Sequence, residues 1–176
     1  MIIKNIQQDI DKLKNLDKAV IDSSSLIYLS KLGLMEKTAT VVRLMAPEMV
    51  FAETGMEPGL IEKIDNLKKD KTTTADRQVL NLALQEQCAV VSDDKKILHR
   101  AEQNGLDYFN ALMLVLLLFG RNRLTAKETS LKLEQLKHIA RYHIEIWDYG
   151  QKIFETMAEK RMKTKGRDGL SGLTQK

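Results

Sequence analysis

The chain has 176 residues, of which 43% are hydrophobic, 30% charged and 5% aromatic, with only two prolines. This length suits a single domain with its own core, and the composition favours a helix-rich protein over a β-sandwich or a disordered chain. Residues 157–176 hold six basic and two acidic residues and so account for the whole net charge of +4, which therefore does not by itself indicate nucleic-acid binding.

Targeting and membrane signals are missing from the sequence. The single cysteine, Cys88, cannot form an intramolecular disulfide, and the N-terminus lacks the charged-then-apolar pattern of a secretory signal. The longest apolar run spans residues 111–119, well short of the roughly 20 residues that a membrane-spanning helix needs. We therefore expect a cytoplasmic protein without a membrane segment.

The start of the chain predicts a helix, a strand and a second helix. Apolar residues in the segment 5–17 recur every three or four positions, which is typical of an amphipathic helix. The apolar run 19–21 predicts a short buried strand that ends at Asp22. An apolar helical face follows, so this part of the chain predicts a strand, a tight turn and a helix.

The middle of the chain predicts mainly helices. We expect one at residues 40–44, a second that opens at Pro47 and carries Glu53, and a short exposed one at residues 60–70. Proline suits the first turn of a helix because its missing N–H costs nothing there. After a loop, an Ala- and Leu-rich helix follows with Asp76 in its first turn.

The rest of the chain repeats the order of strand, acid and helix. The β-branched run 89–91 predicts a strand that ends in Ser92, Asp93 and Asp94, and Gly105 suits the C-terminal end of the helix that follows. The remaining expected elements are a short third strand at 106–109, a buried apolar helix at 110–119, helices at 125–140 and 143–158, and a flexible basic tail at 159–176.

Short apolar strands that alternate with helices indicate a mostly parallel central sheet covered on both faces. We therefore predict an α/β fold, a three-layer α/β/α sandwich with extra C-terminal helices. The expected organisation is an N-terminal amphipathic helix at 1–18, a central domain at 19–158 and the tail at 159–176.

Acidic residues occupy the positions at which such a fold binds ligands. In open parallel sheets ligands lie beyond the carboxyl ends of the strands, and Asp22 and the pair Asp93-Asp94 both follow a predicted strand. Asp76 begins a helix that is expected to face the same edge, whereas Glu53 is the least constrained. Each acid also has a purely structural interpretation, as a helix cap, a member of a capping box or an ordinary exposed acid.

The order and setting of these acids resemble the PIN-domain family over residues 19–158. The segments similar to its four elements are, in chain order, VIDSSSLIYLSKLGL, APEMVFAETG, TTTADRQVLNLALQ and AVVSDDKKILHRAEQNGL. The fourth is the most specific, because it assigns a metal role to Asp94 and makes Asp93 the variable residue. Residues 110–154 are similar to the helical ending of the VapC-like toxin branch, although Phe109-Asn110-Ala111 stands where many members have glycines.

The resemblance implies a metal-dependent endoribonuclease whose products carry a 5′-phosphate and a 3′-hydroxyl. The expected cofactor is Mg²⁺ or Mn²⁺, which prefer oxygen ligands and can assist phosphodiester hydrolysis. The expected catalytic and metal-binding acids are Asp22 and Asp94 as principal ligands, Asp76 and Glu53 completing the cage, and Asp93 in reserve. Without metal these acids should repel one another and raise at least one pKa among them.

Four further residues are candidates for binding RNA. Ser23 or Ser24 would donate to a phosphate or a metal-bound water, or would merely cap a helix. Lys95 and Arg100 would contact the RNA strand, or would only form a solvated helix face.

Two other interpretations stay open at this point. A receiver-like signalling domain also holds magnesium with acids at strand ends, and a PIN-like module without activity would bind RNA and leave it intact. Within the ribonuclease interpretation, the expected partners are RNA, a small antitoxin protein if the chain is the toxin of a toxin–antitoxin pair, and a second copy of the chain through the apolar helix at 111–119.

Overall fold

The computed structural model describes residues 5–65 and 74–170, with the side chains of the last helix described through Lys163. These residues form a five-stranded sheet in the order β3-β2-β1-β4-β5. Its strands are β1 (Lys18–Ile21), β2 (Arg43–Pro47), β3 (Glu62–Ile64), β4 (Ala89–Val91) and β5 (Tyr108–Phe109).

Every pairing in this sheet is parallel, with β1 at the centre. Ala19 of β1 is in register with Leu44 of β2 on one side and with Ala89 of β4 on the other. Because all strands run in the same direction, their carboxyl ends lie at one edge of the sheet. The predicted α/β fold with a mostly parallel sheet is therefore confirmed.

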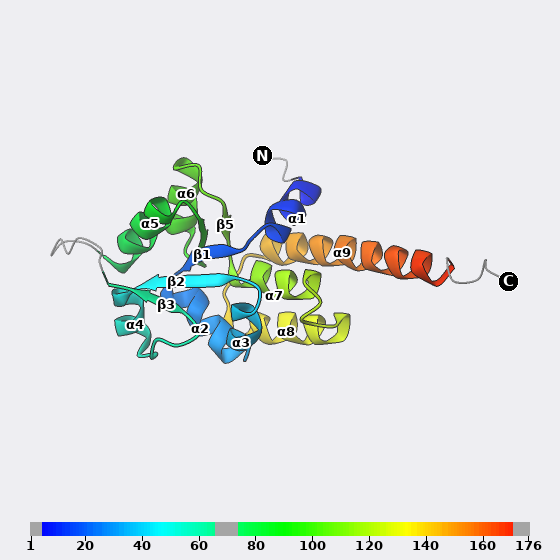
Figure 1. Cartoon of the computed structure of the whole chain (residues 1–176), viewed down its shortest axis with the longest axis horizontal. Coiled ribbons are helices and arrows are strands. Elements are labelled where there is room, and N and C mark those ends of the chain that lie inside the picture. The colour runs from blue at the N-terminus through cyan, green and yellow to red at the C-terminus, as the bar shows by residue number, and fades with distance from the viewer. Residues whose placement is uncertain (1–4, 66–73, 171–176) are drawn as a thin grey trace.

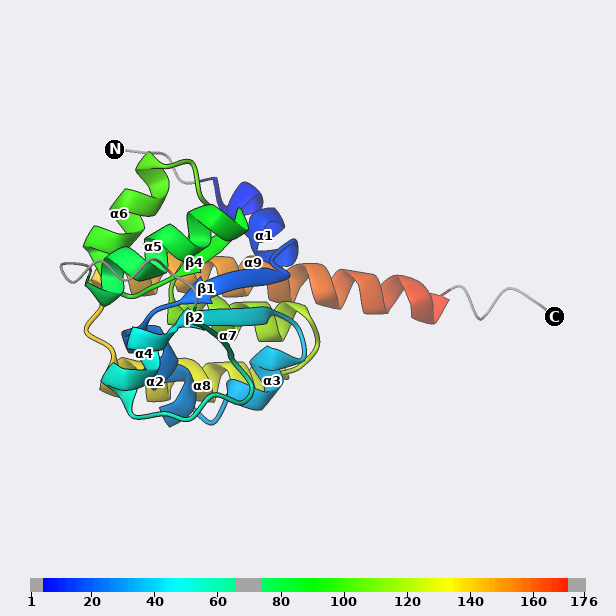
Figure 2. The ribbon, with the colours of Figure 1, turned by 60° about the vertical axis from the view of Figure 1, so that its left-hand side comes forward.

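Helices cover both faces of the sheet (Figures 1 and 2). α5 and α6 lie on one face, and α2, α7 and α8 lie on the other. α9 packs beside α1 and α7 and extends past the rest of the molecule. The helices are α1 (Ile6–Lys14), α2 (Ser23–Lys31), α3 (Met35–Ala39), α4 (Glu48–Thr54), α5 (Ala75–Glu86), α6 (Lys95–Gln103), α7 (Ala111–Gly120), α8 (Ala126–Ile139) and α9 (Ile144–Leu170).

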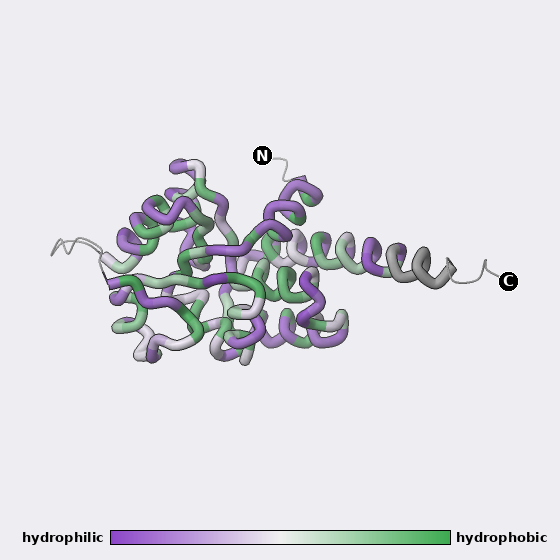
Figure 3. The backbone as a smooth tube through the Cα atoms, viewed as in Figure 1, coloured by the Kyte–Doolittle hydropathy of each residue, from purple (hydrophilic) through white to green (hydrophobic). Residues whose placement is uncertain are grey.

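The core is centred on β1, β4 and α7. Val20, Val90 and Leu116 are completely buried, and Figure 3 shows hydrophobic residues along most of α7. The predicted buried helix at 110–119 is thus confirmed. Among the helices that the structure describes, none combines the length and hydropathy needed to cross a membrane.

Three segments differ from their predicted structure. Residues 43–47 form β2 where the sequence predicts a helix at 40–44, and residues 62–64 form β3 inside the helix predicted at 60–70, whose last five residues lie outside the described part. Parallel pairing with neighbouring strands outweighs the helix propensity of these short runs. α9 continues to Leu170, so the backbone is helical over most of the segment predicted to be a flexible tail.

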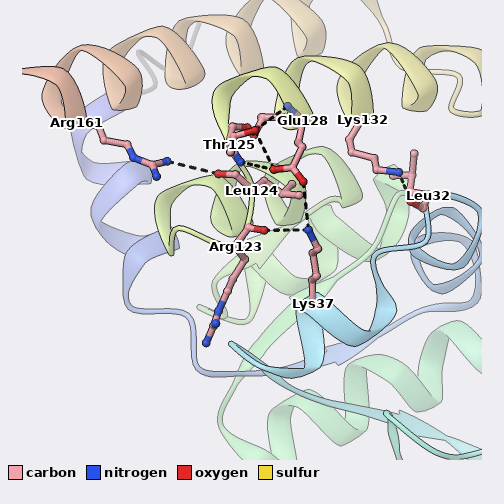
Figure 4. Close-up of polar contacts among 9 residues, drawn as sticks. Leu32, Lys37, Arg123, Leu124, Thr125, Glu128, Lys132 and Arg161 are labelled. Carbon is pink, nitrogen blue, oxygen red and sulfur yellow. Dashed lines mark hydrogen bonds and ion pairs between the residues drawn. The ribbon is translucent and has the colours of Figure 1, made fainter.

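Polar contacts fix the start of α8 against its neighbours (Figure 4). Thr125 forms a capping box with Glu128, whose backbone N–H donates to the threonine Oγ at 3.2 Å and whose carboxylate accepts from the threonine N–H at 2.7 Å. Lys37 of α3 lies 3.5 Å from the Glu128 carboxylate. Lys132 of α8 donates to the Leu32 carbonyl at 2.7 Å, so α8 is tied to both α2 and α3.

Candidate functional site

A pocket of about 180 Å³ lies at the carboxyl edge of the sheet. Its walls come from the start of α2, from α4, and from the beginnings of α5 and α6. It is lined by Asp22, Ser23, Ser24, Val50, Glu53, Ala75, Asp76, Val79 and Asp94. The four predicted catalytic acids, which are far apart in the sequence, therefore share one pocket.

A larger pocket, of about 760 Å³, lies at the opposite edge, between α1 and the amino ends of β1 and β4. It contains none of the predicted site residues. Lys12 and Asp107 line it and form an ion pair, with 2.6 Å between Nζ and Oδ1. Since ligands of open parallel sheets bind beyond the carboxyl ends of the strands, the smaller acidic pocket is the better candidate site.

Asp22 is the buried member of the acid group, with 5% of its surface exposed. It follows β1 and caps α2: Oδ1 accepts from the Ser25 N–H at 2.8 Å. Oδ2 accepts from the hydroxyls of Ser24 at 2.8 Å and Ser92 at 2.6 Å. The carboxylate is thus fully held by the helix start on one side and by the end of β4 on the other, so the structural role as a cap and a place in the pocket coexist.

Glu53 and Asp94 are exposed acids held by local contacts. The Ser23 hydroxyl donates to Glu53 Oε2 at 2.5 Å, which ties α4 to the first turn of α2. Asp94 caps α6 by accepting from the Lys96 N–H at 2.6 Å, while its own N–H donates to the Ser92 hydroxyl at 3.0 Å. Both acids line the pocket.

Asp76 shows that the acids interact electrostatically. Burial raises the pKa of Asp76, and the charges of Asp94, Asp22 and Glu53 raise it further, in that order. Arg100 acts in the opposite direction and lowers the pKa. A raised pKa in this group agrees with the prediction for acids that share a site without metal.

Asp93 does not line this pocket although it neighbours Asp94 in sequence. Its carboxylate accepts from the Ser25 hydroxyl at 2.5 Å, from the Tyr142 hydroxyl, and from the Ala111 N–H at 3.4 Å. Burial raises the pKa of Asp93, whereas the hydrogen bonds from Ser25 and Tyr142 lower it. It does not line the pocket, so its predicted reserve role as a metal ligand has no geometric support.

The predicted RNA-binding residues fall into two groups. Ser23 and Ser24 line the pocket, but their hydroxyls donate to Glu53 and Asp22. Lys95 and Arg100 are exposed on α6 and lie outside the pocket lining. Arg100 is nevertheless close enough to act on Asp76, so positive charge does lie beside the acids.

The carboxylates that line the pocket are of the right chemical type for a hard cation, but their present spacing is not that of a metal site. Carboxylate oxygens are the ligands that Mg²⁺ and Mn²⁺ prefer, and the raised pKa of Asp76 marks a place where a cation would relieve repulsion. Within residues 5–65 and 74–163, however, no group of three or more His, Cys, Asp or Glu side chains is arranged to hold a metal ion as it stands. The acids share a pocket without yet forming a cage.

Sequence reasoning missed three residues that organise this site. Ser25 and Ser92 are completely buried and bond to Asp93 and Asp22, and Tyr142 reaches Asp93 from the connection between α8 and α9. The run of serines after Asp22 was a usable signal for the first of these. Tyr142 gives no such signal, because it is 49 positions from its partner in the sequence.

Comparisons with known proteins add one structural likeness. No family model and no curated protein matches the chain. Among solved structures it is similar to a PilT N-terminus (PIN) domain protein from the hyperthermophilic archaeon Sulfolobus solfataricus, at 13% sequence identity and a TM-score of 0.43. The match covers 57% of this chain and 93% of that one. At this level of likeness the functional assignment rests on the pocket itself.

Proposed function

We propose that this protein is a divalent-metal-dependent endoribonuclease that hydrolyses RNA phosphodiester bonds at the acidic pocket. The observation that carries the proposal is the convergence of Asp22, Glu53, Asp76 and Asp94 from four separate segments on one pocket at the carboxyl edge of a parallel sheet. The acids also interact there, because the pKa of Asp76 is raised first by burial and then by the charges of Asp94, Asp22 and Glu53.

The proposed metal ligands are Asp22 and Asp94, with Asp76 and Glu53 binding directly or through water. A bound Mg²⁺ or Mn²⁺ would activate a water, offset charge on the phosphoryl group and stabilise the leaving oxygen. Asp22 supplies a fixed point, because it is buried and accepts three hydrogen bonds. The other three acids are exposed, and their side chains would have to move closer to Asp22 to bind a shared cation.

The remaining residues of the site have supporting roles in this proposal. Ser23 and Ser24 orient Glu53 and Asp22, and Lys95 and Arg100 contribute positive charge beside the pocket for the RNA backbone. Because Arg100 also lowers the pKa of Asp76, it favours the ionised form that a metal ligand needs.

The test is RNA cleavage by the full chain with Mg²⁺, with Mn²⁺ and with EDTA. We expect cleavage only with metal, and Asp22→Asn or Asp94→Asn should reduce it by more than the roughly 10- to 100-fold that loss of an outer-shell partner costs. Glu36→Gln is the matched control. Glu36 is an exposed acid on α3, which comes just before the amino end of β2 and so lies away from the carboxyl edge that carries the pocket. Cleavage that survives EDTA or both Asn substitutions would overturn the proposal.

The same preparation separates the other two interpretations. An acid-labile phosphoryl adduct after incubation with acetyl phosphate would favour the receiver-like domain. RNA binding with no cleavage under any metal would favour the inactive RNA-binding module.

For the biological role we propose the toxin of a toxin–antitoxin pair, which the likeness of residues 110–154 to the VapC-like ending supports. Induced expression should then arrest growth, and Asp22→Asn should abolish the arrest. A small protein encoded beside this chain should relieve it, and arrest by the Asn variant would count against a toxic nuclease.

A further inference from the structure

Asp93 joins three segments of the protein behind the acidic pocket. Its hydrogen-bond partners are Ser25 in the first turn of α2, the backbone N–H of Ala111 at the start of α7, and Tyr142 between α8 and α9. The Tyr142 ring also packs against Trp147, with ring centroids 5.1 Å apart. Asp93 is half-buried, and a carboxylate shielded from water is costly unless it is hydrogen-bonded, so these three bonds favour one orientation of its side chain.

Asp93 is linked to Asp22 through Ser25, and in the chain it lies between Ser92 and Asp94, which are hydrogen-bonded to each other. Ser25 donates its hydroxyl to Asp93 at 2.5 Å and its backbone N–H to Asp22 at 2.8 Å. On the other side of Asp93 in sequence, Ser92 donates to Asp22 at 2.6 Å and accepts from the Asp94 N–H at 3.0 Å. Movement of Asp93 would therefore displace the turn that carries Asp94 and the helix start that holds Asp22.

We propose that Asp93 and Tyr142 form a positioning pair that fixes the backbone turns carrying Asp22 and Asp94 beside the pocket, and that Asp93 is not itself a metal ligand. The proposal rests on the proposed function, because positioning matters only if the acids act together. It assigns a role to the connection between α8 and α9, which otherwise lies outside the site. The pair acts through orientation, since Tyr142 is neutral and leaves the charge of the acids unchanged.

The variant that tests the pair most cleanly is Tyr142→Phe, which removes one hydroxyl and keeps the ring. Its matched control is Tyr149→Phe, because Tyr149 also lies near the start of α9 and also donates to a carboxylate, that of Asp9 on α1, away from the site. Asp93→Asn is the second variant, in which an amide replaces the carboxylate that accepts all three bonds.

Mn²⁺ affinity of the full-length variants, measured by calorimetry, is the first readout. We expect Tyr142→Phe and Asp93→Asn to weaken Mn²⁺ binding about 10- to 100-fold, as loss of an outer-shell partner does, with Tyr149→Phe unchanged. On RNA, kcat should fall by a similar factor while KM stays within about twofold. If Asp93 were a ligand, freeing it from Tyr142 would leave Mn²⁺ affinity equal or tighter, and that result would overturn the proposal.

Amide hydrogen exchange separates failure of this pair from failure of the proposed function. The N–H groups of Ser25 and Asp94 should exchange at least about fivefold faster in Tyr142→Phe than in Tyr149→Phe, whether or not the protein cleaves RNA. Equal exchange would overturn the positioning pair even in an active ribonuclease. A wild-type protein that neither binds Mn²⁺ nor cleaves RNA would overturn the proposed function, with the exchange rates still deciding whether Asp93 and Tyr142 fix the two acids.

Discussion

Replacing Asp22 by Ala or by Asn should separate the structural role of this acid from its chemical one. Asp22 accepts three hydrogen bonds, one from the Ser25 N–H at the start of α2 and two from the hydroxyls of Ser24 and Ser92. Alanine removes every acceptor. Asparagine keeps one carbonyl oxygen for the Ser25 N–H and turns an amide group towards two hydroxyls, which can rotate to accept from it.

The magnitude follows from which donors lose their partner. Loss of the cap costs about 1 kcal/mol, and leaving the completely buried Ser92 hydroxyl without its acceptor costs roughly 1–3 kcal/mol more. Ser24 is partly exposed, so water can replace its bond. We expect Asp22→Ala to lower the free energy of unfolding by roughly 2–4 kcal/mol and Asp22→Asn by about 1 kcal/mol or less.

Urea unfolding of the metal-free proteins at pH 7, followed by far-UV circular dichroism, measures both losses. The two variants should be equally inactive on RNA, because both lack the charge at this position. Equal losses of stability would refute this reasoning, since only Asn preserves the acceptor that Ser25 uses.

Three further predictions concern the acid group and the packing of the helices. The pKa of Asp76 is raised above its ordinary 3.8, so the folded protein holds this proton more tightly than the unfolded chain does. The stability that protonated Asp76 contributes is full below pH 3.8 and is lost as pH rises through the raised pKa. In urea unfolding without added metal, Asp76→Asn should therefore make the unfolding midpoint less dependent on pH over this range. Thr125→Ala breaks the capping box of α8 in Figure 4 and should cost about 1 kcal/mol in the same unfolding assay. A Cβ at Gly150 would lie 2.6 Å from a methyl carbon of buried Leu112, so Gly150→Ala should lower stability by roughly 1–3 kcal/mol, and an unchanged midpoint would show that α9 repacks freely on α7.

The sequence predicted β1, β4 and β5, whereas β2 and β3 lie where helices were expected. β1 and β4 are runs of small and β-branched residues that end at an Asp or a Ser-Asp-Asp, and both signals are local. β2 contains Leu44, Met45 and Ala46, which are good helix formers, and is a strand because β1 and β3 pair with it on both sides. Such pairing partners are far away in the chain, and periodicity within a short window cannot identify them.

The pair Asp93-Asp94 shows a second limit of sequence reasoning. Two adjacent identical side chains have the same local propensities, and either could cap α6 or line the pocket. The structure separates them through Tyr142 and Ser25, which draw Asp93 inward, while the cap of α6 keeps Asp94 at the pocket. The resemblance assigns the metal role to Asp94 by its spacing from Ser92, and in the structure Asp94 lines the pocket whereas Asp93 does not.

The first turn of α2 explains how the acids are oriented without being neutralised. Consecutive residues of a helix point about 100° apart, so the serines at 23–25 face three directions. Their hydroxyls reach three different acids: Glu53, Asp22 and Asp93. Lysine or arginine side chains in place of the serines could also orient these carboxylates, but their positive charge would cancel that of the acids, as it does in a structural ion-pair network. Hydroxyls orient the three acids and add no positive charge, so the proposed function requires that a cation from solution supply it.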